Sequence, residues 1–290
     1  MTPTHPLTIV HGYQGMATYI QAARQKPSSE WIRLWHEHAV APYWQEWAAG
    51  QFNEERIRQQ MQTPIMDLEP LAEAVELLSQ SGVEQIVRQA YDRITAILPP
   101  QPSERAVCIY ALDPQDHKTL ERQNGVVGSC VGDNILLQIN PHGTDWQAWT
   151  QDVLAHEYHH SIWGYNYFVV RKQTRMDLLT SFIVDGQADS FAKALYPGLK
   201  ASWVSQLSPA QEREQWQKVQ PYLKSEDPAD YARFMFGSEA EGIPWCLGYA
   251  LGFRIIQAFL KVHPQVTWTE LLDQDPWDLL TESGYEPETG

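Results

Sequence analysis

Cysteine is scarce in this sequence of 290 residues: there are three, at Cys108, Cys130 and Cys246. An odd number of widely spaced cysteines does not form the framework of a disulfide-rich secreted domain. Their neighbours, Val107 and Leu247 among them, are apolar, so we expect small buried thiols. The first residues also show neither the cationic start nor the long apolar stretch of a secretory signal. These absences predict a cytoplasmic protein.

The sequence also contains few basic residues and few long apolar runs. Lys and Arg number 21 against 36 Asp and Glu, a net charge of −15. This charge argues against nucleic acid or an anionic membrane as a partner. The longest apolar stretch, Ile243–Leu260, contains Pro244, Arg254 and Gln257, which predicts a buried helix rather than a membrane span. Apolar residues make up 43% of the chain and charged residues 20%, as is usual for a globular protein.

One stretch carries a recognisable chemical pattern. Within Val153–Gly164, the residues His156, Glu157 and His160 have the H-E-x-x-H spacing of zinc-dependent hydrolases. Residues four apart lie on one face of a helix, so the two imidazoles can reach a single ion. Glu157 borders that face, where it can accept a proton from water beside the ion. The spacing also arises by chance, and the helix would then carry scattered polar residues only.

A second helix is predicted over Met176–Tyr196, and it supplies carboxylates. Its apolar stripe includes Leu178 and Phe182, and continues through Asp185 and Asp189. Carboxylates are rarely buried without a cation or a metal as partner. We therefore expect one aspartate to bind the ion and the other to accept a hydrogen bond from a histidine ring. Alternatively, this face is half exposed and Asp189 is simply solvated.

Three segments together carry a resemblance to a known family. They read HEYHH at 156–160, VDGQADSF at 184–191 and GIPWCLGYALGFRII at 242–256. In these segments the sequence resembles the bacterial family of predicted zinc-dependent proteases of the YjaZ type, and more distantly the gluzincin peptidases. Matching patches are scattered over Val107–Tyr285. The resemblance implies a zincin-like catalytic core that binds zinc.

The resemblance also assigns roles to the two aspartates. Asp185 stands where the family normally carries the glutamate of E-G-L-A, its third zinc ligand, and Asp189 stands at the place of a supporting acid. Aspartate is one methylene shorter than glutamate, and zinc–carboxylate bonds span only about 2.0–2.2 Å. The change leaves open a weaker site, another metal, or Asp189 as the ligand. We favour Asp185.

The helix predicted over Pro244–His263 contributes both small and polar residues. Gly248 and Gly252 stand one turn apart, which permits the close approach of another helix. Tyr249 and Arg254 are its polar members, and by analogy with related peptidases either could stabilise a developing oxyanion opposite the metal. For Tyr249, a place in the core with a satisfied hydroxyl is the alternative.

The expected fold class is α+β and mostly helical. We predict a helical N-terminal lobe over residues 1–103 and a zincin-like metallopeptidase domain over 104–290, with the proline-rich segment 99–103 at the boundary. β-Forming residues predict strands over Ala106–Leu112 and Asn134–Ile139. These strands would form the small mixed sheet that precedes the metal-binding helix.

A further strand is expected just before Asn134. By the resemblance, Val126–Ser129 would be the edge strand that pairs with an extended peptide. A plain hairpin with a bulge at Gly128 or Gly132 fits the glycine spacing equally well.

The sequence thus predicts a zinc-dependent metallopeptidase with a peptide or protein substrate. Zinc would be held by His156, His160 and Asp185, Glu157 would be the general base, and Tyr249 would assist. The alternative is a non-catalytic or chaperone-like peptide-binding protein that retains a zincin fold. The motif is also compatible with a hydrolase that acts on a non-peptide substrate.

Overall fold

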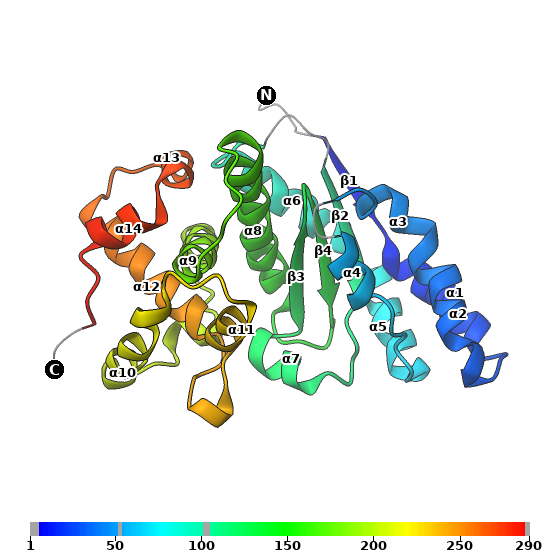
Figure 1. Ribbon diagram of the computed structural model, residues 1–290. Coiled ribbons are helices and arrows are strands. Elements are labelled where there is room, and N and C mark those ends of the chain that lie inside the picture. Colours follow the sequence, from blue (N-terminus) through cyan, green and yellow to red (C-terminus); the bar gives the residue numbers. More distant parts are fainter. Residues whose placement is uncertain (1–5, 52–53, 101–104, 288–290) are drawn as a thin grey trace. The chain divides into compact units, whose positions relative to one another are not determined.

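The structure is a computed structural model, and it describes residues 6–51, 54–100 and 105–287. The chain divides into two compact units, Met1–Ile162 and Trp163–Gly290. The predicted boundary between residues 103 and 104 falls within 101–104, outside the described residues. Within the described ranges, helices predominate and the strands form one small sheet, so the predicted mostly helical α+β class is confirmed (Figure 1).

The sheet of the first unit is mixed, with the strand order β1-β2-β4-β3. Strands β1 (Leu7–Val10), β2 (Arg105–Ala111) and β4 (Asn134–Ile139) are parallel, and β3 (Val126–Val131) runs antiparallel to β4. The strands predicted around β2 and β4 are confirmed. The sequence predicts only helices before residue 103, yet β1 lies there, because a strand of four residues is too short to show a periodicity.

Strands β3 and β4 form a hairpin whose register is continuous from Val126↔Ile139 to Val131↔Asn134. The turn is Gly132–Asp133, and Gly132 adopts the left-handed φ of 61° that a tight hairpin turn needs. The expectation of a bulge at Gly128 or Gly132 was therefore wrong. The expectation of an edge strand is confirmed, since β3 ends the sheet among the strands that the structure describes.

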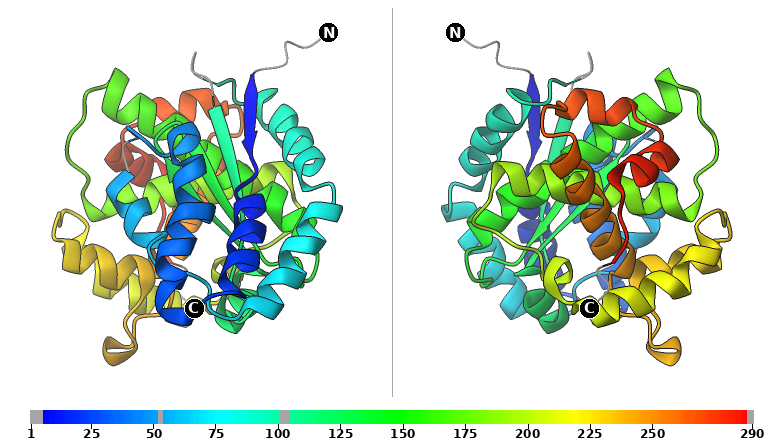
Figure 2. Two further views of the ribbon diagram at one scale, coloured as in Figure 1. Left: turned by 90° about the vertical axis from the view of Figure 1, so that its right-hand side faces the viewer. Right: turned by 90° about the vertical axis from the view of Figure 1, so that its left-hand side faces the viewer.

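Helices α1 (Gly12–Ala23), α3 (Ala41–Trp47) and α5 (Leu68–Gln80) pack against β2. In the left view of Figure 2 the blue helices of this segment lie in front of the green strands. A π-helical turn, His36–Val40, precedes α3, and Pro42 lies in the first turn of α3, where proline is tolerated.

Residues 61–67, which lie between α4 (Glu54–Gln60) and α5, are not helical. The remaining helices of this unit before residue 146 are short 3₁₀ or α-helical segments. They are η1 (Ser28–Glu30), α2 (Trp31–Trp35), α4 (Glu54–Gln60), α6 (Val83–Thr95) and α7 (His117–Gln123).

Helix α8 (Trp146–Gly164) carries the histidine motif and continues as the π-helix Tyr165–Val170. Its most buried side chains include Leu154, Tyr158 and His159, each 0% exposed. The two motif histidines are only half-buried. Tyr158 and His159 thus occupy the core-facing side of the helix, and the two motif histidines lie outside it.

The core of the second unit contains α9 (Leu178–Leu195) and α12 (Leu247–Val262), which pack against each other. Gly186 of α9 faces the backbone of Gly252, and a Cβ at either residue would clash with the other helix. A Cβ at Gly248 would likewise meet Phe182. The predicted close approach at the α12 glycines is confirmed, because side chains are absent where the backbones meet.

Shorter helices surround this pair. They are η4 (Ser202–Ser205), α10 (Pro209–Val219), η5 (Gln220–Tyr222), α11 (Pro228–Phe236), η6 (Glu239–Glu241), α13 (Trp268–Asp273) and α14 (Pro276–Ser283). Among the described residues, every helix is too short or too polar to traverse a lipid bilayer.

Candidate metal centre

The two motif histidines converge within the first unit. His156 Nε2 and His160 Nε2 are 2.9 Å apart, and the rings stand nearly perpendicular with centroids 4.5 Å apart. This geometry follows from the spacing of four residues, which puts both side chains on one face of α8. The sequence-based expectation that both imidazoles can reach a single point is therefore met within this helix.

Glu157 lies beside the pair and against the edge strand. Its side chain is 9% exposed, and the backbone of Gly128 in β3 approaches it closely. A Cβ built at Gly128 would clash with Glu157 Cγ and would lie 2.7 Å from Glu157 Oε1 and from Val153 Cγ1. The absent side chain at Gly128 thus leaves the space that the glutamate occupies.

Helix α8 is fixed in its unit by polar contacts that sequence reasoning missed. The guanidinium of Arg105, 2% exposed, donates to Ser161 Oγ at 2.5 Å and to the backbone oxygen of Asp133 at 2.7 Å. It also lies over the ring of Tyr158, whose hydroxyl donates to the carbonyl of Leu98 at 2.9 Å. Arg105 therefore connects the start of β2, the β3–β4 turn and α8. The local sequence does not single out Arg105, because an arginine at the start of a strand is common.

The two predicted aspartates lie on α9, in the second unit. The helix begins at its cap Asp177, whose Oδ1 accepts from the backbone N–H of Thr180 at 2.8 Å. Asp185 and Asp189, one turn apart, are each 8% exposed. One oxygen of Asp189 accepts a hydrogen bond from the indole N–H of Trp203 at 2.7 Å. The half-exposed face considered as an alternative is thus excluded for this helix.

The two polar residues of α12 have different surroundings. Arg254 forms an ion pair with the buried Glu212 and donates to the carbonyl oxygen of Leu207 at 3.0 Å. Its charge is committed to this local structure, which argues against a role at an oxyanion. Tyr249 is half-buried, and its ring contacts that of Trp203 edge-on, with centroids 5.7 Å apart.

Among the described residues, the side chains with metal-ligand chemistry that could hold an ion are His156, His160 and Asp185. The histidine pair of the first unit supplies two of these candidate ligands, and α9 of the second unit supplies the third. The cysteines do not belong to this set: Cys108 and Cys246 are buried, and burial raises the pKa of the Cys108 thiol well above its ordinary value. For Cys130, burial and then the negative charge of Glu157 raise the thiol pKa.

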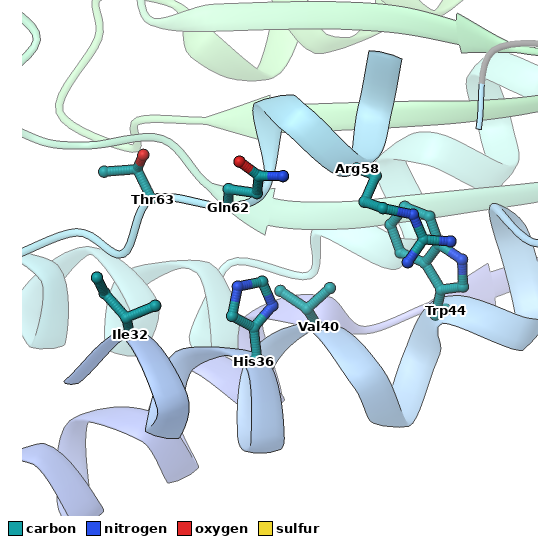
Figure 3. Close-up of a pocket in the computed structure, with 7 residues that line it drawn as sticks. All are labelled: Ile32, His36, Val40, Trp44, Arg58, Gln62 and Thr63. Atoms are coloured by element: carbon teal, nitrogen blue, oxygen red, sulfur yellow. The ribbon is translucent and has the colours of Figure 1, made fainter. Parts of the chain in front are cut away.

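The first unit also contains a pocket of about 470 Å³ that lies apart from the histidine motif in the sequence (Figure 3). Its lining includes His36, Trp44 and Arg58, but Arg58 is paired with Glu54 at 2.6 Å and lies over the Trp44 ring. Among the described residues, no group of metal ligands occurs at His36. We assign no chemistry to this pocket.

A histidine pair on one helix face, with a neighbouring glutamate, defines the class of proteins that carry an H-E-x-x-H metal motif. The chain belongs to the family described as "Predicted Zn-dependent protease (DUF2268)", which matches residues 83–281. Membership confirms the resemblance seen in the sequence.

A curated relative is the uncharacterized protein YjfC of Bacillus subtilis (strain 168). It is 23% identical over 236 residues, which cover 76% of this chain and 76% of the relative. No solved structure matches the chain.

Proposed function

We propose that this protein is a zinc-dependent metallopeptidase that hydrolyses peptide bonds, with zinc held by His156, His160 and Asp185 and with Glu157 as the general base. The observation that carries the proposal is the convergence of the two Nε2 atoms, 2.9 Å apart, on the helix that also presents the buried Glu157. The family to which the chain belongs is described as a predicted zinc-dependent protease, which supports the same function.

The residues fit a zinc ion. Two nitrogens that each lie about 2.0–2.1 Å from a tetrahedral zinc are about 3.3 Å apart, so the present separation of 2.9 Å needs only a small side-chain adjustment. Two imidazoles and one carboxylate are the donor set of several catalytic zinc sites, and they leave a coordination position open. Zinc bound in this way would acidify water and polarise a carbonyl group.

Glu157 would perform the proton transfers. Its carboxylate, held between α8 and the backbone of Gly128, would accept a proton from the attacking water and deliver it to the amine of the leaving peptide. Tyr249 would donate a hydrogen bond to the carbonyl oxygen as negative charge develops there. Asp189 would act as an acceptor that orients a ligand, in addition to its hydrogen bond with Trp203.

Metal analysis tests the ligand set. The purified protein should bind one zinc ion per chain, and His160→Ala and Asp185→Ala should each lose it. Asp189→Asn should retain zinc, because we assign Asp189 a supporting role. Zinc retained by Asp185→Ala and lost by Asp189→Asn would transfer the ligand role to Asp189.

Glu157→Gln tests the general base. The amide keeps the size of the side chain but cannot accept the proton, so cleavage of any susceptible peptide should fall by a factor on the order of 10²–10⁴. Bound zinc should be unchanged. Glu121→Gln, at an exposed position of α7, is the matched control and should retain full activity. Full activity of Glu157→Gln would reject this residue as the base.

A peptide-binding protein without turnover is the second candidate, and it is favoured by Asp185 in place of the glutamate that the resembled family carries. Broad screening of casein and peptide libraries with the zinc-loaded protein distinguishes the two candidates. Cleavage that is abolished in Glu157→Gln supports the peptidase. Binding without cleavage supports the second candidate, although a purely binding site has no need of a base beside the ion.

A further inference from the structure

The second unit contains a continuous row of five aromatic side chains, drawn from four segments. We call it the aromatic row, and it consists of Tyr231 and Phe236 of α11, Tyr249 of α12, Trp203 of η4, and Trp245. Ring centroids are 5.7 Å apart for Trp203–Trp245 and Trp203–Tyr249, 6.4 Å for Phe236–Tyr249 and 5.8 Å for Tyr231–Phe236. Most of these contacts are edge-to-face, the arrangement that aromatic pairs prefer.

The aromatic row contacts the face of α9 that carries the two aspartates. Trp203 donates its indole N–H to Asp189 Oδ2 at 2.7 Å, and Asp185 lies one turn before Asp189 on the same helix face. The hydrogen bond fixes the orientation of the Trp203 ring. Trp245 contacts Trp203 on one side, and Tyr249, Phe236 and Tyr231 follow on the other, each ring in contact with the next.

These rings are not buried as core side chains are. Phe236 is 48% exposed and Tyr231 is 38% exposed, while Trp203, Trp245 and Tyr249 are half-buried. The core of this unit, by contrast, consists of side chains that are almost fully buried. Contiguous exposed aromatic surface is uncommon on soluble proteins and marks a binding site more often than scattered apolar residues do.

The backbone holds the segments that carry Phe236 and Trp245 close together. Gly237, directly after Phe236, has a φ of 90°, and a Cβ there would lie 2.8 Å from Trp245 Cα. Cys246, directly after Trp245, has a left-handed φ of 54°, which is unfavourable for a residue other than glycine. Local strain of this kind is retained where the surrounding structure requires a particular side-chain arrangement. The rings are therefore placed by the backbone rather than left mobile.

We propose that the aromatic row is a substrate subsite that binds a large apolar side chain of a peptide, preferably an aromatic one. The proposal rests on the peptidase function, since it takes the aspartate face of α9 as part of the active site. The occupant follows from the chemistry of the lining. Ring faces and edges offer apolar contact, and the Asp189 carboxylate is already engaged by Trp203. An anionic side chain would lose its hydration beside the rings and this carboxylate without gaining a partner there.

The test measures binding rather than cleavage. Zinc-loaded Glu157→Gln is titrated calorimetrically with blocked hexapeptides that differ at one central position, Phe, Leu, Ala, Asp or Lys. Because burial of a phenylalanine side chain is favourable by about 1.5–3 kcal/mol, the Phe peptide should bind roughly 10- to 100-fold more tightly than the Ala peptide. The Asp peptide should bind no better than the Ala peptide, and the Lys peptide should bind less tightly than the Phe peptide.

Phe236→Ala, added to Glu157→Gln, should reduce the ratio of Phe to Ala affinity to about threefold or less, because it removes part of the apolar lining. Its exposed position makes loss of folding unexpected, and a thermal melt checks this. Tyr222→Ala, which removes an exposed tyrosine outside the row, is the matched control and should keep the ratio.

The subsite would be overturned if the Phe and Ala peptides bind equally well, or if no peptide binds. It would also be overturned if Phe236→Ala keeps the ratio of Phe to Ala affinity. A Phe236→Ala protein that is a monomer in sedimentation, where the parent protein is a dimer, would instead make the row an interface between two copies. Since binding is measured in the Glu157→Gln background, a wild-type protein that cleaves nothing would refute the peptidase alone. Cleavage without side-chain preference would refute the subsite alone.

Discussion

The backbone of Gly128 lies against the side chain of Glu157, the residue proposed as the base. Nothing about the backbone conformation requires glycine there, since its φ is not positive. The requirement is space: a methyl group would clash with Glu157 Cγ. Because Gly128 has only a hydrogen in place of a side chain, the Glu157 carboxylate can lie against the strand.

We predict that Gly128→Ala lowers kcat while bound zinc is retained. The added methyl group must displace the Glu157 side chain, and overpacking of this kind also costs about 1–3 kcal/mol of stability. Peptide cleavage, metal content and urea unfolding measure the three quantities. Gly198→Ala is the control, because a Cβ there meets nothing within 4 Å. Unchanged kcat in Gly128→Ala would show that the strand moves instead of the glutamate.

Tyr19 gives a prediction about alkaline pH. Its side chain is fully buried, its hydroxyl donates to the Ile65 carbonyl at 3.1 Å, and burial raises the pKa of Tyr19 to about 12. The folded state thus holds the phenol proton more tightly than the unfolded state, whose tyrosine pKa is about 10. This contribution to the free energy of unfolding is complete below pH 10 and is lost as the pH rises through about 12.

The measurement compares urea unfolding of wild type and Tyr19→Phe from neutral pH to about pH 12. Phenylalanine keeps the ring but has no proton to lose, so the variant should lose less stability than wild type above about pH 10. Other tyrosines, Tyr158 among them, also have raised pKa values, and the comparison cancels their effect. Parallel curves for the two proteins would contradict the prediction.

At the scale of elements, the crossing of α9 and α12 organises the second unit. The two helices meet at Gly186 and Gly252, where the backbone of one touches the backbone of the other. Gly186 directly follows Asp185, so the contact that brings the helices together also determines the position of a proposed ligand. The same contact therefore packs the two helices together and sets the position of Asp185.

We predict that Gly252→Ala destabilises the protein by about 1–3 kcal/mol, because the methyl group has no room beside the Phe182 carbonyl. The displaced α9 should also weaken zinc binding. Urea unfolding and zinc titration measure the two effects, with Gly198→Ala again as the unstrained control. A Gly252→Ala protein as stable as wild type would show that the helices can separate without loss.

At the scale of the whole molecule, the proposed ligands are far apart in the chain and fall in different compact units. His156 and His160 belong to Met1–Ile162, and Asp185 belongs to Trp163–Gly290. A ligand that binds the folded state stabilises it, and the gain is about 4 kcal/mol when its free concentration is 1,000 times Kd. Zinc bound by the proposed ligands should therefore stabilise the folded protein.

We predict that a chelator lowers the unfolding temperature of wild type and that added zinc restores it. His160→Ala should unfold at one temperature whether or not chelator is present, because it has lost a ligand. Differential scanning calorimetry at fixed protein concentration measures both. An equal response of the variant would assign the effect to zinc bound elsewhere.

Several parts of this architecture were predictable because the relevant interactions are local. The spacing of His156 and His160 alone implies that their rings share a helix face, and the β-forming run at 134–139 corresponds to β4. The glycine pair in α12 predicted close packing against another helix. Each of these signals acts within one or two helical turns or one strand.

The remaining features depend on residues far apart in the chain, and only the tertiary structure decided them. Strand β1 pairs with β2 across nearly a hundred residues, Arg105 reaches Ser161, and Trp203 binds Asp189. Periodicity reports which side of an element is apolar, but it does not identify the partner that covers that side. The sequence by itself therefore determined the H-E-x-x-H motif and the helix that carries it. Packing decided what supports Glu157 and which aromatic ring contacts Asp189, because such contacts depend on where the chain returns in space.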